Sequence, residues 1–211
     1  MKLNKVLALA LSGVMAVSML AGCSNNSGNG GQNGEEQPPV VDTTIAGAVN
    51  DKLDDDSVVT FTYSTEVEEA AKQVARVYGG LTQDLVDTIT KDEPSAKDAL
   101  KNYLNIEEMA ALSSLGNNQK TLVAGTQTAI SVKAYKDLTA DGAKKQAAEA
   151  FANWVNNAKL EDEKTDDASN LKYSFNYTGD IAMISADDEG HPVYVVIAVV
   201  ECETAAPVKA E

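Results

Sequence analysis

The side chains best suited to nucleophilic chemistry are few, because the sequence holds two cysteines, Cys23 and Cys202, and a single histidine, His191. A thiol hydrolase needs its cysteine within hydrogen-bond reach of a base. If one strand carries His191 and Cys202, their offset of eleven residues, at about 3.3 Å each, separates them by about 36 Å and points them to opposite faces. We therefore expect no catalytic pair. Cys202 ends an apolar run and should be buried and inert, whereas His191 should be solvated at a turn.

Other catalytic and metal-binding patterns are missing from the sequence. It has no cluster of histidine and cysteine for zinc, no Gly-x-Ser-x-Gly motif and no glycine-rich loop that opens a helix to bind phosphate. Asp54-Asp55-Asp56 offers carboxylates to calcium, but the alternating ligands, the glycine and the closing glutamate of an EF-hand loop are lacking. A solvated turn is the better interpretation. We expect no catalytic, cofactor-binding or metal-binding residue, and an enzyme is the less favoured class.

Cys23 has the most informative surroundings, because it follows an N-terminal apolar run. Lys2 and Lys5 precede residues 6–19, which are Val, Leu, Ala and Met broken only by two serines and a glycine. This order is typical of an export signal. The run is shorter than the roughly 20 residues that a membrane-spanning helix needs. Leu20-Ala21-Gly22 then stands directly against Cys23.

Leu20-Ala21-Gly22-Cys23 resembles the lipobox of bacterial lipoproteins. The resemblance implies that residues 1–22 are a signal peptide cleaved after Gly22 and that the thiol of Cys23 carries a diacylglyceryl group, with acyl chains such as palmitate. It also implies a location on the outer face of the cytoplasmic membrane. A single acyl chain binds a membrane only marginally, so two or more chains are expected to anchor the protein durably. A plain signal peptide with an incidental Cys23 is the alternative.

The residues after the expected cleavage point predict a tether and one domain. Removing 22 of 211 residues leaves 189, which suits one domain of ordinary size. Residues 24–39 contain no aliphatic or aromatic side chain, so nothing offsets the entropy of ordering them. Residues 23–43 are therefore expected to be a lipidated, flexible tether, with a root-mean-square reach of about 20 to 24 Å for its Gly-rich part.

The charge balance limits the partners. Two of the 17 Lys and Arg and none of the 32 Asp and Glu precede Cys23, so cleavage changes the net charge from −15 to −17. Nucleic acid is a poor partner, because binding it requires basic patches that neutralise phosphates. We expect the membrane to be contacted through the lipid on Cys23, and another exported protein or a cell-wall component to be the macromolecular partner.

Hydrophobic periodicity predicts several helices. A short helix is expected near Ile45–Leu53, and a capping box at Thr65–Glu68 should begin a long amphipathic helix that reaches Ile89, with an interruption at Gly79-Gly80. Further helices are predicted over 96–104, 106–115 and 139–158. The last has a continuous apolar face that includes the single tryptophan, Trp154, which should pack in the core.

Alternation of apolar and polar residues predicts strands at 57–63 and 173–183, a turn at 186–190, and a strand over Val193–Val200 that is apolar on both faces. Such a strand belongs in the middle of a sheet, with both faces covered. Residues 119–138 fit a strand or a helix, and we favour a helix. Residues 161–170 should form a polar loop.

The expected fold class is therefore α+β, with several helices packed on a small antiparallel sheet that includes a C-terminal β-hairpin. We expect one globular domain over residues 44–204 and a frayed tail over 205–211.

A partial resemblance concerns the C-terminal half. Residues 147–157, which include Trp154, are similar to the Trp-bearing helix of the cysteine-rich secretory protein superfamily. Residues 179–183, 187–190 and 194–196 look like that family's terminal hairpin. The resemblance implies an α-β-α sandwich. The family's histidines and glutamates have no counterparts here, so its metal-binding cleft would be lost.

Three functional hypotheses follow. The leading one is a lipid-anchored extracytoplasmic binding or interaction protein. The alternatives are a cell-surface hydrolase that uses paired carboxylates, as glycosidases do, and a structural or signalling lipoprotein without a small ligand, which should expose a broad apolar patch.

Overall fold

A computed structural model describes residues 40–41, 44–77, 94–107, 109–116, 125–188 and 191–210. All of these belong to one compact unit, Glu36–Glu211. The expected signal peptide, Cys23, most of the tether and the Gly79-Gly80 interruption lie outside the described residues. No helix in the described ranges is long and apolar enough to cross a membrane.

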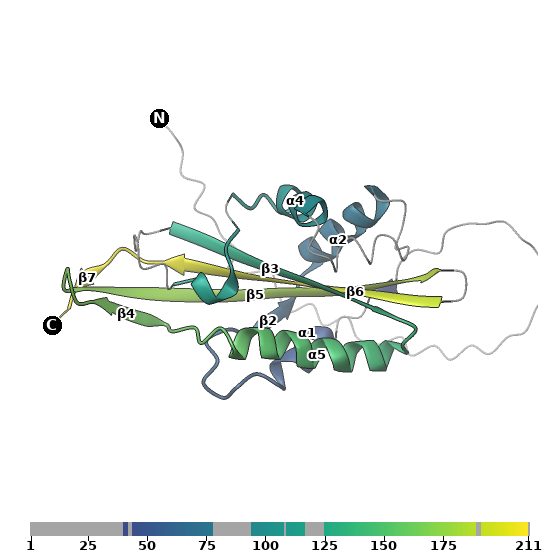
Figure 1. The fold of residues 1–211 in the computed structure, drawn as a ribbon, viewed down its shortest axis with the longest axis horizontal. Coiled ribbons are helices and arrows are strands. Elements are labelled where there is room, and N and C mark those ends of the chain that lie inside the picture. The colour runs from purple at the N-terminus through teal and green to yellow at the C-terminus, as the bar shows by residue number, and fades with distance from the viewer. Residues whose placement is uncertain are drawn as a thin grey trace, which may run out of the picture. The chain divides into compact units, whose positions relative to one another are not determined.

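The described residues form helices and one mixed sheet, so the predicted α+β class is confirmed. The strand order is β1-β5-β6-β3, and β2, β4 and β7 also pair with β5 (Figure 1). The strands are β1 (Val40–Val41), β2 (Phe61–Tyr63), β3 (Gly125–Lys136), β4 (Glu163–Asp166), β5 (Leu171–Asp188), β6 (His191–Thr204) and β7 (Val208–Lys209). The helices are α1 (Ile45–Asn50), α2 (Thr65–Val77), α4 (Pro94–Tyr103) and α5 (Ala140–Asn156), with a 3-10 turn η1 (Leu112–Ser114).

The sheet differs from the small antiparallel sheet that the sequence predicts. β2 runs parallel to β5, with Phe61 opposite Gly179, and β5 itself is 18 residues long. A Cβ atom on Gly179 would lie 2.9 Å from the Thr60 carbonyl oxygen and from the Phe61 ring. The glycine therefore lets β2 approach β5 closely, which a local reading of the sequence does not reveal.

β6 lies between β5 and β3, in the central position that its apolar faces predict. It pairs antiparallel with β5 from Asp188↔His191 to Phe175↔Thr204, and antiparallel with all twelve residues of β3. The turn expected at 186–190 lies partly outside the described residues.

Both faces of the sheet are buried against helices. On one face, Val196, Ala198 and Val200 of β6 share a core with residues of α1 and α5, including Ile45 and Phe151. On the other face, alternate β6 residues share a second core with residues of α2 and α4; its members on these elements are Val193, Val195, Ile197, Val67, Ala70, Ala71 and Leu100. Figure 1 shows α1 and α5 on one side of the sheet and α2 and α4 on the other. Because side chains alternate between the two faces of a strand, successive residues of β6 pack into two separate apolar clusters.

Side-chain hydroxyls cap the starts of α5 and α2, and the cap of α2 lies one residue before the predicted position. Thr139 caps α5, because its Oγ1 accepts a hydrogen bond of 3.1 Å from the Gly142 amide. α2 begins at Thr65 itself, and the Ser64 hydroxyl accepts a 3.3 Å bond from the Val67 amide. The expected capping box at Thr65 was therefore wrong by one position. Two adjacent hydroxyl residues compete for this role, and the Ser64 amide is already fixed to the Ile181 carbonyl.

Several weak local patterns were interpreted wrongly. The helix favoured for residues 119–138 is wrong, since residues 125–136 form strand β3. Pairing with β6 outweighs a helical pattern of similar quality. The helix expected over 106–115 is reduced to η1. The expected polar loop at 161–170 includes β4, and the tail expected to fray contains β7, which pairs with Leu171 and Lys172. These short edge strands are formed by pairing with β5 and carry little pattern of their own.

Candidate functional site

Cys202, the free thiol among the described residues, is fully buried. It lies opposite Tyr177 on β5. Burial raises the pKa of the Cys202 thiol, against the opposing effect of hydrogen bonds from Tyr177, Thr204 and Gly116. A buried thiol with a raised pKa is a poor nucleophile, which agrees with the inert role predicted for it.

His191 lies at the opposite end of β6 from Cys202. Its exposed side chain places Nδ1 2.7 Å from Oδ1 of the equally exposed Asp137. His191 pairs with Asp188, whereas Cys202 pairs with Tyr177, so the structure does not bring the histidine and the thiol together. The predicted solvated position of His191 is confirmed.

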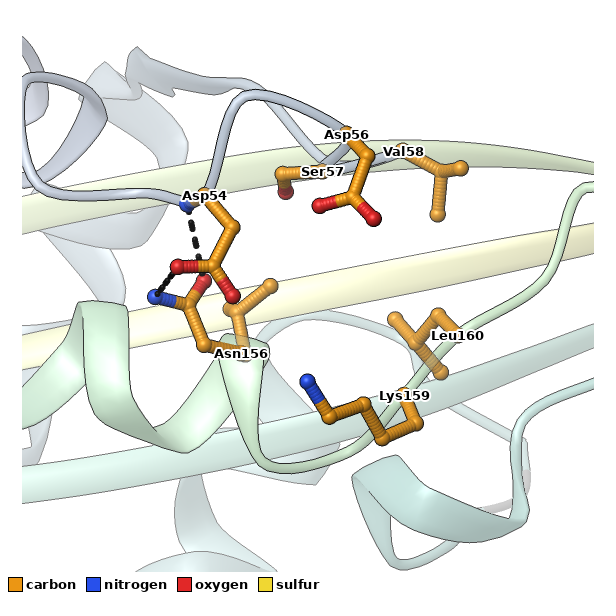
Figure 2. A pocket seen from close by; sticks show the side chains of 8 residues that line it. Asp54, Asp56, Ser57, Val58, Asn156, Lys159 and Leu160 are labelled. Carbon is orange, nitrogen blue, oxygen red and sulfur yellow. Dashed lines mark hydrogen bonds between the residues drawn. The ribbon is translucent and has the colours of Figure 1, made fainter.

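Asp54 and Asp56 of the triple aspartate border a small hollow of about 60 Å³ beside the end of α5 (Figure 2). The Asn156 side-chain amide bonds to Asp54 in both directions: Nδ2 donates to the Asp54 carboxylate at 3.1 Å, and Oδ1 accepts from the Asp54 amide at 3.2 Å. Figure 2 shows these bonds, with Asp56 and Lys159 on opposite sides of the hollow. Ligand pockets are typically 300–1,000 Å³, so this hollow is too small for one. The bonds between Asp54 and Asn156 fasten the loop after α1 to the end of α5. In the part of the chain that the structure describes, no three metal-ligating side chains gather.

A larger feature is the open groove between β3 and α5, of about 760 Å³. Its lining residues are Val132, Lys133, Ala134 and Tyr135 of β3, and Gln146, Glu149, Ala150 and Asn153 of α5. The sequence does not predict this groove, because the helix favoured for residues 119–138 would leave it without its strand side. The alternation of Ile130, Val132 and Ala134 with Ser131 and Lys133 was the sequence signal that pointed to the strand.

Two groups of ionisable side chains also escaped sequence reasoning. In the first, the buried Glu68 of α2 accepts hydrogen bonds from Tyr63 of β2 and from Lys72, one helical turn further on. Burial acts to raise the pKa of Glu68, but the bonds from Lys72 and Tyr63 outweigh it and hold that pKa below its usual value. The spacing of Glu68 and Lys72 signals an ion pair in the sequence, whereas Tyr63 joins through the tertiary structure alone.

The second group consists of carboxylates on the sheet. Asp180 of β5 accepts a 3.1 Å hydrogen bond from Thr62, and burial raises its pKa in spite of that bond. The pKa of Glu201 is also raised, first by desolvation and then by the neighbouring carboxylates of Asp180 and Glu203. The pairing of the two strands lets Asp180 act on Glu201 although they lie twenty-one positions apart in the sequence.

Trp154 packs as its periodic neighbours predict. Its ring meets the buried Phe151 ring edge to face, with centroids 6.3 Å apart and planes at 84°. Trp154 is partly buried against the core that α5 shares with the sheet. Its apolar contacts account for its position on the helix.

Tyr135 provides a test of this part of the structure. Its hydroxyl oxygen is buried and has no hydrogen-bond partner among the described residues, and burial raises its pKa to about 12. Ionisation of this hydroxyl therefore opposes folding: the stability of the chain is independent of the group below the ordinary tyrosine pKa of about 10, and falls between about pH 10 and 12, where the unfolded chain ionises first. Tyr135→Phe should leave the free energy of unfolding at pH 7 unchanged or raise it by up to about 1 kcal/mol.

Urea unfolding at pH 7 and pH 11 measures this effect. The advantage of Tyr135→Phe over the unaltered chain should grow at pH 11, while Tyr63 and Tyr177 titrate alike in both proteins. An equal difference at the two pH values would contradict the buried hydroxyl.

Comparison with protein-family models, with curated proteins and with solved structures found no match to this chain.

Proposed function

We propose that this protein is a lipid-anchored binding or interaction protein on the outer face of the bacterial cytoplasmic membrane. The observation that carries the proposal is Leu20-Ala21-Gly22-Cys23, placed directly after a basic start and an apolar run. Cleavage after Gly22 would make the lipidated Cys23 the first residue of the mature chain. Buried acyl methylenes contribute about 0.8 kcal/mol each, so two or more acyl chains provide a durable anchor.

The tether and the body support a role in presentation at the membrane surface. The Gly- and Asn-rich residues 24–39 contain nothing to bury and would hold the domain about 20 to 24 Å from Cys23 on average. The net charge of −17 after cleavage repels the domain from anionic lipid headgroups and keeps it available to other partners. The groove beside β3 is large enough for a bound segment.

Mass spectrometry of the membrane fraction tests the anchor. The expected result is an N-terminal peptide that begins at Cys23 and carries the mass of a diacylglyceryl group. A chain that is freely secreted, unmodified and begins at another residue would overturn the proposal.

A cell-surface hydrolase is the second candidate, and Asp180 with Glu201 is the observation that favours it. Both carboxyls have raised pKa values, and the Asp180 carboxylate contributes to the raised pKa of Glu201. A raised pKa makes a carboxyl better suited to general acid catalysis. Hydrolysis of peptidoglycan or a glycoside by the purified chain, abolished by Glu201→Gln, would support this candidate over a binding protein. Neither the hollow at Asp54 nor the groove beside β3 is lined by the pair.

The distant relationship to the cysteine-rich secretory protein superfamily is also a proposal. Its support is the position of the Trp154 helix on a sheet that has helices on both faces. A structural or signalling lipoprotein without a small ligand is the third candidate, and it needs an apolar docking patch.

A further inference from the structure

We propose that the outer edge of β3, together with the groove beside α5, binds an extended acidic segment of another exported protein by adding it to the sheet as a strand. This inference rests on the proposed role as an interaction protein and names the class of partner. Its basis is the direction of the backbone groups of β3, the groove along the strand, and the charge of the strand.

The backbone direction follows from one hydrogen bond. The Thr128 carbonyl accepts a 2.8 Å bond from the Ala110 amide, and Thr128 forms an isolated parallel bridge with Met109. Met109 and Ala110 lie outside the β3–β6 ladder, so the backbone groups of Thr128 that meet them point away from β6. Since the direction alternates along a strand, those of Ile130, Val132, Ala134 and Lys136 point outward too. The Asp137 amide donates to the Pro192 carbonyl of β6. Odd-numbered positions therefore face β6, which agrees with even-numbered positions facing outward.

Among the residues that the structure describes, this outer edge has no partner strand over about half of β3. β3 pairs with β6 along its whole length, but among the described residues its other edge is paired only at the Thr128 bridge. From Ile130 to Lys136, four amides and four carbonyls therefore present themselves as a template for another strand. An extended peptide that pairs with such an edge obtains its affinity from backbone hydrogen bonds and its specificity from alternate side chains.

The groove provides space for those alternate side chains. It runs between β3 and α5 and is lined by Lys133 and Tyr135 from the strand and by Gln146 and Asn153 from the helix. The Tyr135 side chain itself packs against the core on this face of the sheet.

Charge selects the occupant. β3 carries Lys133 and Lys136 and no acidic residue over its twelve positions, in a chain with 32 Asp and Glu against 17 Lys and Arg. The groove also contains Glu149, which lies 3.9 Å from Lys52 and is therefore partly balanced. A second copy that paired β3 with β3 would bring lysines of both strands together, and edge lysines oppose such self-pairing. An acidic strand instead places carboxylates beside Lys133 in the groove. Lys136 lies three residues further along the strand and points to the other face of the sheet.

The direct experiment uses a synthetic probe of eight residues in which glutamate alternates with valine, with both ends blocked. The chain isolated from membranes, in detergent micelles, is titrated with this peptide and with a matched peptide in which lysine replaces each glutamate. The glutamate peptide should bind at least about tenfold more tightly, a difference of about 1.4 kcal/mol. No binding of the glutamate peptide at millimolar concentration, or equal binding of both peptides, overturns the proposal.

Amide hydrogen exchange locates the site residue by residue. In the free chain the amides of Ile130, Val132 and Ala134 should exchange faster than those of Ser131 and Lys133, which bond to β6. The glutamate peptide should slow the first set by about tenfold or more and leave the second set unchanged. Slowing at other positions only would place the peptide elsewhere and contradict the proposal.

A proline variant separates edge pairing from simple charge attraction. Ala134→Pro removes an outward amide that the ladder with β6 does not use, and proline is tolerated at such edge positions. It should weaken binding by about tenfold, as expected from one or two lost hydrogen bonds, whereas the control Ala134→Ser should bind normally. If the proline variant unfolds, methylation of alternate amides of the peptide makes the same test on the intact protein. Unchanged binding in the folded variant, or by the methylated peptide, rejects strand addition.

The remaining outcomes are also decisive. A concentration-dependent dimer that Ala134→Pro abolishes would identify a second copy as the occupant and reject the acidic segment. The anchor and the peptide site fail separately: lipid on Cys23 without peptide binding rejects only the site, and peptide binding by an unlipidated chain rejects only the anchor.

Discussion

The Cys23→Ala chain is expected to lack lipid entirely and to retain residues 1–22. Cleavage after Gly22 and attachment of the diacylglyceryl group both depend on the cysteine that the lipobox resemblance identifies. The fraction of lipidated protein should fall from nearly all to none. Intact mass and the N-terminal peptide measure the change, and they avoid the ambiguity of membrane association, since an uncleaved apolar segment also binds lipid.

The second cysteine provides the matched control. Cys202→Ala removes the other thiol of the chain from a buried position on β6, so its lipidation should equal that of the unaltered chain. If Cys23→Ala yields the same processed and modified N-terminus as Cys202→Ala, the lipobox interpretation is wrong.

Phe151→Ala should give the largest loss of stability of any single change on α5. The side chain is completely buried between α5 and the sheet, and its ring supports Trp154. Truncation of a buried phenylalanine costs about 3–5 kcal/mol, because apolar contacts are lost and a cavity remains. Single domains have only about 5–15 kcal/mol of net stability, so the variant should be close to unfolding at ordinary temperatures.

Urea unfolding measured by circular dichroism and by Trp154 fluorescence tests this expectation. Lys145→Ala is the matched control on the same helix: it is exposed, and its free energy of unfolding should change by less than about 0.5 kcal/mol. A loss below about 1 kcal/mol for Phe151→Ala would show that α5 does not pack on the sheet as described.

Predictions from the sequence succeeded where many residues repeat one pattern. Ala147, Phe151 and Val155 recur at helical spacing, and all three are buried on α5. Val193–Val200 is apolar at consecutive positions, and it lies in the central strand. In each case enough residues follow the same pattern to outweigh other local conformations.

Predictions failed where the local signal was weak and a partner strand decided the outcome. Residues 125–136 satisfy helical and strand patterns almost equally, and pairing with β6 resolves them. β4 and β7 are short, exposed segments whose extended conformation comes from the edges of β5. The groove beside β3 was missed for the same reason, because it requires both the strand and the correct placement of α5.

The sequence by itself determined the α+β class, the burial of Cys202, the separation of that thiol from His191, and the lipobox-like segment at Cys23, which remains a prediction. These properties depend on composition, on short-range periodicity or on spacing along one strand. Only the tertiary structure decided the parallel pairing of β2, the electrostatic effect of Asp180 on Glu201, and the outward amides of β3. Each of these joins segments far apart in the chain, where the register of strand pairing, and not any local pattern, determines which side chains meet.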